Sequence, residues 1–439
     1  MAVVKKLLRI VFAVVLAVIV LLLVGVLIYT APYWWKHFVT YPRLEKEQAG
    51  LLAKRRTPEK YIRLHDYQGV LHVHSYWSHD SRGVLEEILP AAKKAGLDFI
   101  FFSDHPHAKL DTFPRSYSGM FDGVLFEPGS ESGGMLVFPL DTVVLDWRED
   151  RDTFIKQVVE NGGLVLYSHT EEPHDWSNPD YQGMEIYNIH TDFLDEDSIL
   201  PIMINTAING KKYRRWVYRE IYDDQTKIWA NWDSLNSHRR IVGMAAVDAH
   251  NNQNFRARYT PDGLVEWVGP NAKTIRVARA GWKEKLLLGK PDAAGWAFKW
   301  EVDTYFGSFN FVNTHIFGNR LTGKALKDNL VKGHAYISFT SLADARGFQF
   351  FSVDDGDNIT AIMGDSVSAD RVQALRAISP LPVQFQLIRN GKVIDSVPNV
   401  YDYTFKPQMS PGVYRIVALL YFDEQWTPWV LTNPIYIVP

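Results

Sequence analysis

The segment Gly69-Val70-Leu71-His72-Val73-His74-Ser75 joins a short apolar run to two histidines. Such a run is typical of a buried strand. Residues two apart on a strand share a face, so both imidazoles can reach one metal ion. An isolated HxH pair is weak evidence for a metal site, and its meaning depends on what recurs along the chain.

The same pattern recurs in the chain, because other apolar runs also end in side chains that can bind a metal. The first run is followed by Ser78, His79 and Asp80; Phe99–Phe102 is followed by Ser103-Asp104-His105; Leu164–Tyr167 is followed by Ser168-His169; Ile241–Val247 is followed by Asp248-Ala249-His250. Glu131 lies in the loop-like sequence Pro128-Gly129-Ser130-Glu131, and Glu185 and Asn188 lie at another apolar run, Met184–Tyr187.

Helical sequence patterns lie between these runs. Val84–Ala95 places Val84, Leu85, Ile88, Leu89 and Ala92 on one face, with Pro90 inside it and Gly96 as a residue that ends the helix. Alternating strands and helices predict an α/β fold with a parallel sheet or a β/α barrel. In a barrel the carboxyl ends of the strands meet at one rim, where active sites form.

The order HxH, Asp-His, Glu, His, Asp-x-His closely resembles the polymerase and histidinol phosphatase (PHP) family over residues 69–255. The resemblance implies a distorted β/α barrel that holds two or three divalent metal ions. It assigns His72, His74, Glu131 and Asp248 to one ion, and Asp80 or His79, His105 and His250 to a second. Glu131 would bridge toward a third position that includes His169.

The third position departs from the family pattern. Members with three metals usually have another histidine soon after the glutamate, whereas this chain has Gly133-Gly134-Met135 and no histidine before His169. Methionine is a poor ligand for Zn²⁺ or Mn²⁺. We therefore expect two ions, with the third absent or weakly held.

The resemblance and the ligand types together predict hydrolysis of a phosphoester by a metal-bound hydroxide. Nitrogen and carboxylate ligands without sulfur suit Zn, Mn or Fe, and paired ions activate water and neutralise phosphoryl charge. Asp104 is predicted to orient a ligand imidazole, and Arg256 and Arg258 to clamp the phosphate of a small phosphorylated substrate. Two alternatives stay open: amidohydrolase-type hydrolysis at a similar site, and a non-catalytic module that binds an envelope ligand.

The N-terminus contains nineteen consecutive uncharged residues, Ile10 to Ile28. A helix of this length spans roughly 28 Å, close to the hydrocarbon thickness of a bilayer. Lys5, Lys6 and Arg9 precede the run, and Tyr29, Tyr33, Trp34 and Trp35 follow it. We predict a single-pass anchor in the cell membrane with an extracytoplasmic catalytic domain; the alternative is a cleaved signal peptide.

The sequence pattern changes in the C-terminal part of the chain, which is rich in predicted strands. Phe348–Phe351, Val383–Ile388, Val413–Tyr421 and Ile435–Val438 read as strands, and Asn390-Gly391 is a hairpin signal. The predicted organisation is a cytoplasmic tail (1–9), a transmembrane helix (10–30), a linker (31–68), the catalytic barrel (69–340) and a small β-sandwich (341–439).

Composition excludes several classes of protein. The chain has 439 residues and no cysteine, which rules out disulfides, Cys-ligated zinc, Fe–S clusters and thiol nucleophiles. The 47 Lys and Arg residues against 50 Asp and Glu residues give a net charge of −3, so no overall basic field indicates a nucleic-acid surface.

Overall fold

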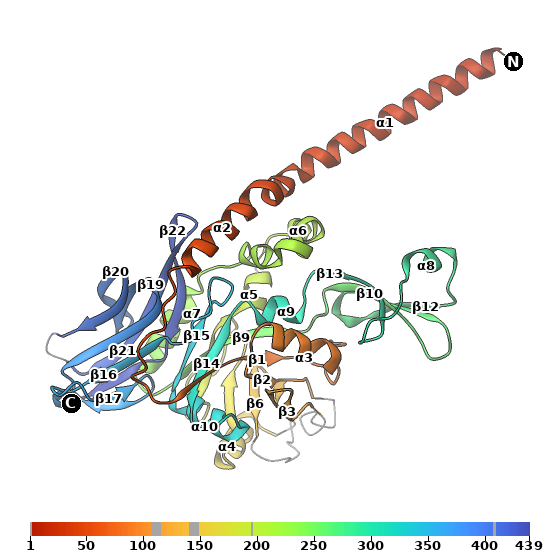
Figure 1. Ribbon diagram of the computed structural model, residues 1–439. Helices are drawn as coiled ribbons and strands as arrows, with labels where there is room; N and C mark the ends of the chain where they lie inside the picture. Colours follow the sequence, from red (N-terminus) through yellow and green to blue (C-terminus); the bar gives the residue numbers. More distant parts are fainter. Residues whose placement is uncertain (1, 107–115, 140–148, 195, 407–409) are drawn as a thin grey trace.

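The computed structural model describes residues 2–106, 116–139, 149–194, 196–406 and 410–439 (Figure 1). The chain starts with a long helix, α1 (Ala2–Trp35), which continues through a short π-helical turn (Lys36–Thr40) into α2 (Tyr41–Leu52). Within the described residues this is the one helix long and apolar enough to cross a membrane, and a signal sequence would have the same properties. α1 projects freely from the body (Figure 1).

The segment expected as a linker is helical in its first half. α2 packs on the body through Tyr41, Leu44 and Leu51, all of which are buried. Asn205 and Tyr41 also share a hydrogen bond. The apolar helix is therefore joined to the body through a second, packed helix.

The body is built on a central, mainly parallel sheet. Its parallel strands run in the order β4-β2-β1-β9-β8-β7, and β6 and β5 continue the sheet as an antiparallel pair. The bounds are β1 (His65–Val73), β2 (Phe99–Phe102), β4 (Val124–Glu127), β5 (Ser130–Ser132), β6 (Met135–Phe138), β7 (Leu164–Tyr167), β8 (Gly183–Asn188) and β9 (Val242–Ala249), with β3 (Gly119–Phe121) beside β4. All five apolar runs predicted as strands belong to this sheet, which confirms the α/β class, while closure into a barrel stays a prediction.

Helices connect and cover these strands. They are α3 (Leu85–Lys94), α4 (Arg151–Glu160), α5 (Ile189–Leu194), α6 (Ile199–Arg219), α7 (Thr226–Asn236), α9 (Tyr305–Phe309) and α10 (Gly323–Lys332). The predicted helix over 84–95 is α3, which contains Pro90 and ends before Gly96, a residue with φ of 68°. Glycine takes this left-handed conformation without steric cost, so it stops the helix as predicted.

Both faces of the central sheet are buried. On β2, Phe99 and Phe101 belong to one apolar cluster, whereas Ile100 and Phe102 belong to another on the opposite face. Burial on both faces is what a parallel sheet requires. It explains why its strands read as continuous apolar runs in the sequence.

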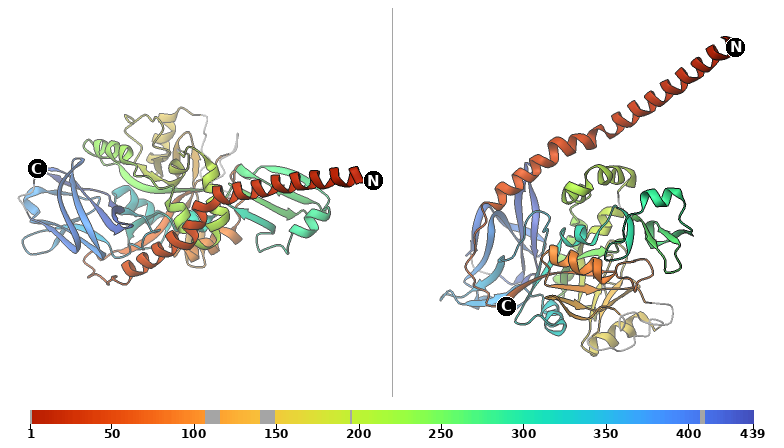
Figure 2. Two further views of the ribbon diagram at one scale, coloured as in Figure 1. Left: turned by 90° about the horizontal axis from the view of Figure 1, so that it is seen from above. Right: turned by 45° about the vertical axis from the view of Figure 1, so that its right-hand side comes forward.

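A second, four-stranded sheet was not anticipated from the sequence. Its order is β12-β11-β10-β13, formed by β10 (Asn254–Tyr259), β11 (Val265–Val268), β12 (Thr274–Ala278) and β13 (Trp296–Glu301), with α8 (Trp282–Leu287) after β12. This module projects from the body on the side toward which α1 points (Figures 1 and 2).

The C-terminal part is mainly antiparallel, as predicted. Its strands are β16 (Gln349–Val353), β17 (Ile359–Ile362), β18 (Ser366–Ser368), β19 (Ala374–Arg389), β20 (Lys392–Phe405), β21 (Gly412–Phe422), β22 (Gln425–Thr432) and β23 (Ile435–Val438). Asn390 and Gly391, with φ of 49° and 76°, form the turn between β19 and β20, as the hairpin signal predicts. The pair β18–β23 is parallel.

Hydrogen bonding continues from the body into this C-terminal part. β14 (Asn313–Gly318) pairs with β1, β15 (Ala335–Ser338) pairs with β14, and β15 also pairs with β22. Arg415 on β21 makes two hydrogen bonds, of 2.6 and 2.7 Å, to Asp233 on α7. The predicted division at residue 340 thus falls next to a strand shared by both parts, and the domain boundary stays a prediction.

Candidate metal centre

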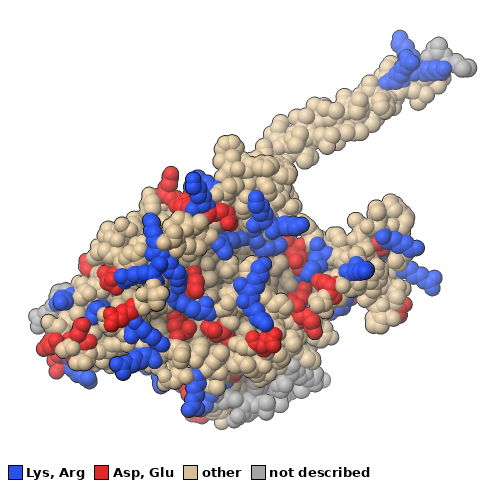
Figure 3. Space-filling view, viewed as in Figure 1, with Lys and Arg blue, Asp and Glu red and all other residues tan. Residues whose placement is uncertain are grey.

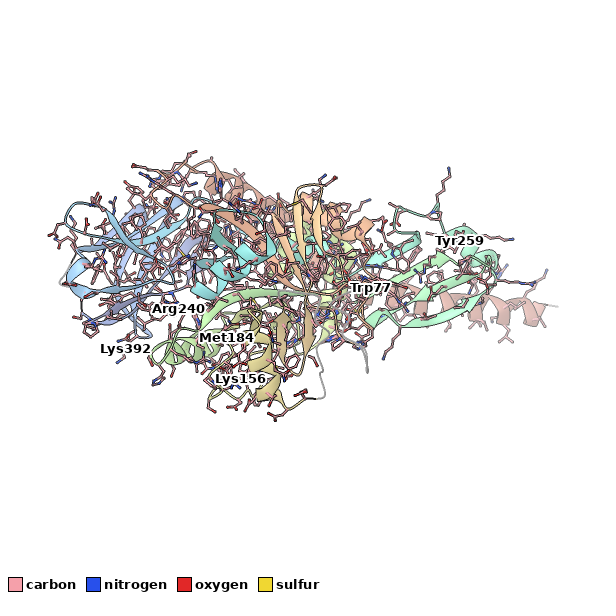
Figure 4. The ribbon with its side chains drawn as sticks, turned by 90° about the horizontal axis from the view of Figure 1, so that it is seen from below. Trp77, Lys156, Met184, Arg240, Tyr259 and Lys392 are labelled. Carbon is pink, nitrogen blue, oxygen red and sulfur yellow. The ribbon has the colours of Figure 1, made fainter. Side chains whose placement is uncertain are left out.

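The metal-competent side chains of the sequence motifs meet at the carboxyl ends of the parallel strands. His72 and His74 come from the end of β1, His105 follows β2, and His169 follows β7; the other members are Asp80, Glu131 on β5, Asp248 at the end of β9, and His250. In the view from below, Trp77 of the loop after β1 lies between Met184 of β8 and Tyr259 of the four-stranded sheet (Figure 4).

Glu131 lies at the middle of the cluster. Its Oε2 atom is 2.9 Å from His72 Nε2 and 3.3 Å from His74 Nε2. Its other oxygen, Oε1, is 3.1 Å from His169 Nε2 and accepts a 3.1 Å hydrogen bond from Ser168. The carboxylate therefore faces imidazoles from two different strand ends, as a bridging ligand must.

Asp248 faces the same imidazole nitrogens. Its Oδ1 atom lies 3.1 Å from His72 Nε2 and 3.3 Å from His74 Nε2. The same oxygen is 2.9 Å from His250 Nε2. Oxygens of two buried carboxylates, Glu131 and Asp248, thus converge on the Nε2 atoms of His72 and His74.

The second predicted ligand set lies beside this pair. Asp80 Oδ2 is 3.3 Å from His250 Nδ1 and 3.5 Å from His105 Nε2, and Ser78 holds Asp80 through a 2.8 Å hydrogen bond. His79 is exposed, but it also groups with Asp80 and His105. Asp80 lines a cavity beside the cluster, and His79 lines a depression that also includes His105, Glu131 and His169. The preference for Asp80 over His79 as the ligand stays a prediction.

These residues fit divalent ions. Four overlapping groups have candidate ligand atoms within 4.8 Å of one another: His72, Glu131, His169 and Asp248; His74, Asp248 and His250; His74, His105 and Glu131; His79, Asp80 and His105. His74 Nε2 and His250 Nδ1 are buried and have carboxylate oxygens 3.3 Å away, yet neither atom makes a hydrogen bond in the described part of the chain. Buried polar atoms normally have partners, and a cation shared with the nearby carboxylates would supply one.

The charges of the cluster are strongly coupled. Burial lowers the pKa of His169, but hydrogen bonds with Glu131 and Glu171 outweigh burial and raise that pKa to about 11. Asp248 and Asp80 likewise outweigh burial at His250 and raise its pKa to about 10. Burial alone would raise the pKa of Glu131, yet the facing histidines hold it well below its usual value. The carboxylates therefore favour positive charge at this position, whether from protons or from metal ions.

Glu185 has a role that the sequence motifs did not reveal. Its Oε1 atom is 2.6 Å from His72 Nδ1, on the ring edge opposite Glu131. Its Oε2 atom accepts hydrogen bonds from the His169 backbone N–H at 2.8 Å and from Asn188 at 2.9 Å. A carboxylate behind a ligand histidine fixes the tautomer and aims the other nitrogen at the metal.

We predict that Glu185→Gln lowers metal affinity and activity by roughly 10–100-fold, the usual effect of losing such a support. Glutamine keeps the size of the side chain but no longer attracts the His72 Nδ1 proton with a full charge. Metal titration and steady-state kinetics on the folded variant would measure both effects. Values within about twofold of wild type would contradict this positioning role.

Asp104 lies behind the first histidine motif. Its carboxylate accepts hydrogen bonds from the Ser75 backbone N–H at 2.6 Å, from Ser75 Oγ at 2.8 Å and from Ser116 Oγ at 2.9 Å. Through Ser75 it fixes the backbone directly after His74. That Asp104 orients a ligand imidazole stays a prediction.

Arg256 and Arg258 are not brought to the cluster. Arg256 is buried and lies 3.4 Å from Glu87 and 3.2 Å from Glu301, and Arg258 lies 2.7 Å from Glu266. Both belong to β10 of the four-stranded sheet. Because these cations already have carboxylate partners and do not line the cavity, we do not propose them as phosphate ligands.

The sequence motifs also omitted His190, which lines the cavity beside the cluster. Its Nδ1 atom lies 3.6 Å from Asp248 Oδ2, and burial lowers its pKa. His190 follows β8 by two residues. The pattern in which metal-competent residues follow apolar runs includes His190, because the run Met184–Tyr187 ends three residues before it.

Comparisons with known proteins add little at this point. Neither a protein-family model nor a curated protein matches the sequence. Among solved structures, a two-domain protein from Bacteroides vulgatus containing a predicted PHP-like metal-dependent phosphoesterase aligns with a TM-score of 0.34 and 10% identity, over 86% of this chain and 98% of that chain. The endo-β-1,4-mannanase from Thermotoga petrophila gives a TM-score of 0.15 and 8% identity, over 86% and 99%. Both TM-scores are below 0.5, too low to assign a function to this chain.

Proposed function

We propose that the chain is a metal-dependent phosphoesterase of the PHP type. The observation that carries this proposal is the convergence of histidine and carboxylate side chains from separate strand ends, with oxygens of Glu131 and Asp248 within 3.3 Å of the Nε2 atoms of His72 and His74. Such nitrogen and oxygen ligand sets suit Zn, Mn or Fe. No lysine lines the cavity among its described residues, which gives no support to the amidohydrolase alternative, where a lysine can bridge the metals.

Each group of residues has a separate task in this proposal. One ion would be held by His72, His74, Glu131 and Asp248, and a second by Asp80, His105 and His250. His169 would be a further ligand on the side of the cluster that Glu131 Oε1 faces. When bound, such ions supply an activated water and neutralise charge on the phosphoryl oxygens. Glu185 and Asp104 would hold the metal ligands in position. His190, at the edge of the cluster, would contact the substrate.

We predict about two transition-metal ions per chain in the purified full-length protein. Met135 is buried in the apolar core, so it cannot complete a third site. Elemental analysis would give the metal content, and assays on phosphomonoesters, phosphodiesters and amides would define the reaction. Chelation should abolish phosphoester hydrolysis and metal addition should restore it. A metal-free preparation with full activity would overturn the proposed function, and three tightly bound ions would overturn the two-ion assignment.

We propose further that α1 anchors the enzyme in the membrane, with residues 1–9 in the cytoplasm and the body outside it. Lys5, Lys6 and Arg9 precede the apolar run, as the positive-inside rule requires. We predict that a reporter fused after Pro439 is active only when it matures in the exported compartment. A reporter active solely in the cytoplasm would reverse the orientation, and a mature protein starting near Pro32 would identify α1 as a signal sequence.

A further inference from the structure

The candidate metal cluster lines a cavity of about 290 Å³ together with an apolar set of residues. This set, the apolar wall of the cavity, comes from α5, α6 and the residues directly after α6, and consists of Ile189, Phe193, Ile202, Val217, Tyr218 and Ile221. Polar side chains such as Thr206, Asn252 and Ser308 complete the lining. A chamber of this kind has room for an apolar group next to the reacting bond.

The charge of the cavity restricts what can enter. None of its described lining residues is Lys or Arg, whereas four are carboxylates: Asp80, Glu131, Asp248 and Asp303. A substrate with several phosphates would meet no Lys or Arg side chain in this lining. One phosphoryl group held at the metals, with an uncharged remainder, is the charge pattern that this cavity accepts.

The apolar wall is attached to the end of the N-terminal helix. On α6, Asn209 donates a 3.1 Å hydrogen bond to the backbone oxygen of Tyr33 on α1. Glu220, at the end of α6, lies 2.8 Å from Lys36. If α1 spans a bilayer, these contacts place the chamber wall next to its surface, where amphiphilic molecules are concentrated.

We propose that the substrate is an amphiphilic phosphoester, with one phosphoryl group at the metals and an alkyl or other apolar group against α5 and α6. This inference rests on the proposed phosphoesterase function. It names the class of substrate for the same site. The source of the substrate can be a lipid in the bilayer or a dissolved alkyl phosphate, since both carry the same chemistry.

Chain-length dependence tests the inference. Binding and hydrolysis of ethyl, butyl and hexyl phosphate by the metal-loaded full-length protein would be compared by calorimetry and phosphate release. Affinity should rise roughly two- to fourfold for each methylene group that becomes buried. A phosphatidic acid in vesicles, assayed beside hexyl phosphate, would show which source the enzyme uses.

A variant of the apolar wall gives the second measurement. Ile202→Asn places an amide in the chamber and should lower the hexyl-to-ethyl ratio of kcat/KM about tenfold. Leu200→Asn makes the same kind of change on α6 at an exposed position outside the cavity, and should leave that ratio unchanged.

The outcomes separate the two proposals. Equal affinity for ethyl and hexyl phosphate, or an unchanged ratio in Ile202→Asn, would overturn the amphiphilic substrate while leaving the phosphoesterase function in place. Rising affinity with chain length but no hydrolysis of any phosphoester would overturn the catalytic function and keep the ligand class. Absence of binding by every alkyl phosphate would overturn the substrate proposal.

A separate observation concerns the tip of the four-stranded sheet. Five large apolar side chains of β12 and α8 are between 49% and 77% exposed: Ile275, Val277, Trp282, Leu286 and Leu287. Within residues 273–290 the basic residues are Lys273, Arg276, Arg279, Lys283, Lys285 and Lys290, and Glu284 is the single acidic residue. Lys and Arg side chains stand out at the far end of this module in Figure 3.

We infer that this tip, residues 273–290, rests on the surface of an anionic bilayer. Exposed apolar groups flanked by basic ones match the interface of such a membrane, where both burial and charge contribute to binding. The tip also extends to the side of the body toward which α1 points (Figures 1 and 2). α1 and the tip together would hold the body at two points on one membrane.

The absence of cysteine makes the test direct. A single cysteine introduced by Leu286→Cys, labelled with a polarity-sensitive dye, would report the environment of the tip in full-length protein reconstituted into phosphatidylglycerol vesicles. Val393→Cys on β20, 53% exposed in the native chain, is the matched control. We expect a blue shift and protection from an aqueous quencher at 286 only. Equal quenching at both positions would overturn the inferred contact.

Discussion

Glu131→Gln should lower kcat by about 10³-fold, the equivalent of about 4 kcal/mol of transition-state stabilisation. The native carboxylate faces His72, His74 and His169 at distances of 2.9 to 3.3 Å. Glutamine has nearly the same size but no charge, so both sides of the cluster would lose a charged ligand. Metal content should fall together with the rate, and both can be measured on the same preparation.

The control for this variant is Glu172→Gln. Glu172 is exposed and lies three residues after His169 in the sequence, but it belongs to none of the candidate metal groups. The same loss of charge at this position should leave kcat and metal content within about twofold of wild type. If folded Glu131→Gln also stayed within twofold, Glu131 could not be a bridging ligand, and the phosphoesterase proposal would lose its central residue.

Much of the candidate site follows from the sequence because a parallel sheet makes strand ends converge. His105, His169 and His250 are far apart in the chain, yet each follows a short apolar run. Once those runs are parallel strands of one sheet, their carboxyl ends share one edge, and the residues after them gather there. The short sequence motifs were sufficient to predict these residues because the parallel sheet brings its strand ends together.

The way in which His72 and His74 meet could not be predicted. Simple strand alternation was expected, but His72 has φ of 65°, and the register of β1 with both β2 and β9 shifts between Leu71 and Val73. His72 therefore sits at a bulge, not in a regular strand. His169 and Asp248 also have positive φ, and such backbone positions gather at functional sites, where the surrounding structure rather than local propensity imposes them.

Arg256 shows why other features of the site could not be predicted from the sequence. It follows the last histidine motif closely, which suggested a phosphate clamp. Its partner Glu87 lies 169 residues away in the chain, and Glu301 comes from β13, the strand that pairs with β10. Ion pairs of this range depend on tertiary packing and leave no local pattern. The same holds for Glu185, whose contact with His72 spans 113 residues.

Asp248→Asn should weaken metal binding and lower kcat/KM by about 10²- to 10³-fold. Asp248 has φ of 40°, a backbone conformation that asparagine tolerates as well as aspartate, so the fold should survive and the lost charge should account for the effect. Asp357→Asn, at another left-handed aspartate (φ of 63°) in the C-terminal part, controls for the backbone and should behave as wild type. Metal titration, circular dichroism and kinetics on both variants decide the matter. If Asp248→Asn kept its metals and its activity, the carboxylate between His72 and His250 would not be a ligand, and the assignment of the first ion would have to move away from β9.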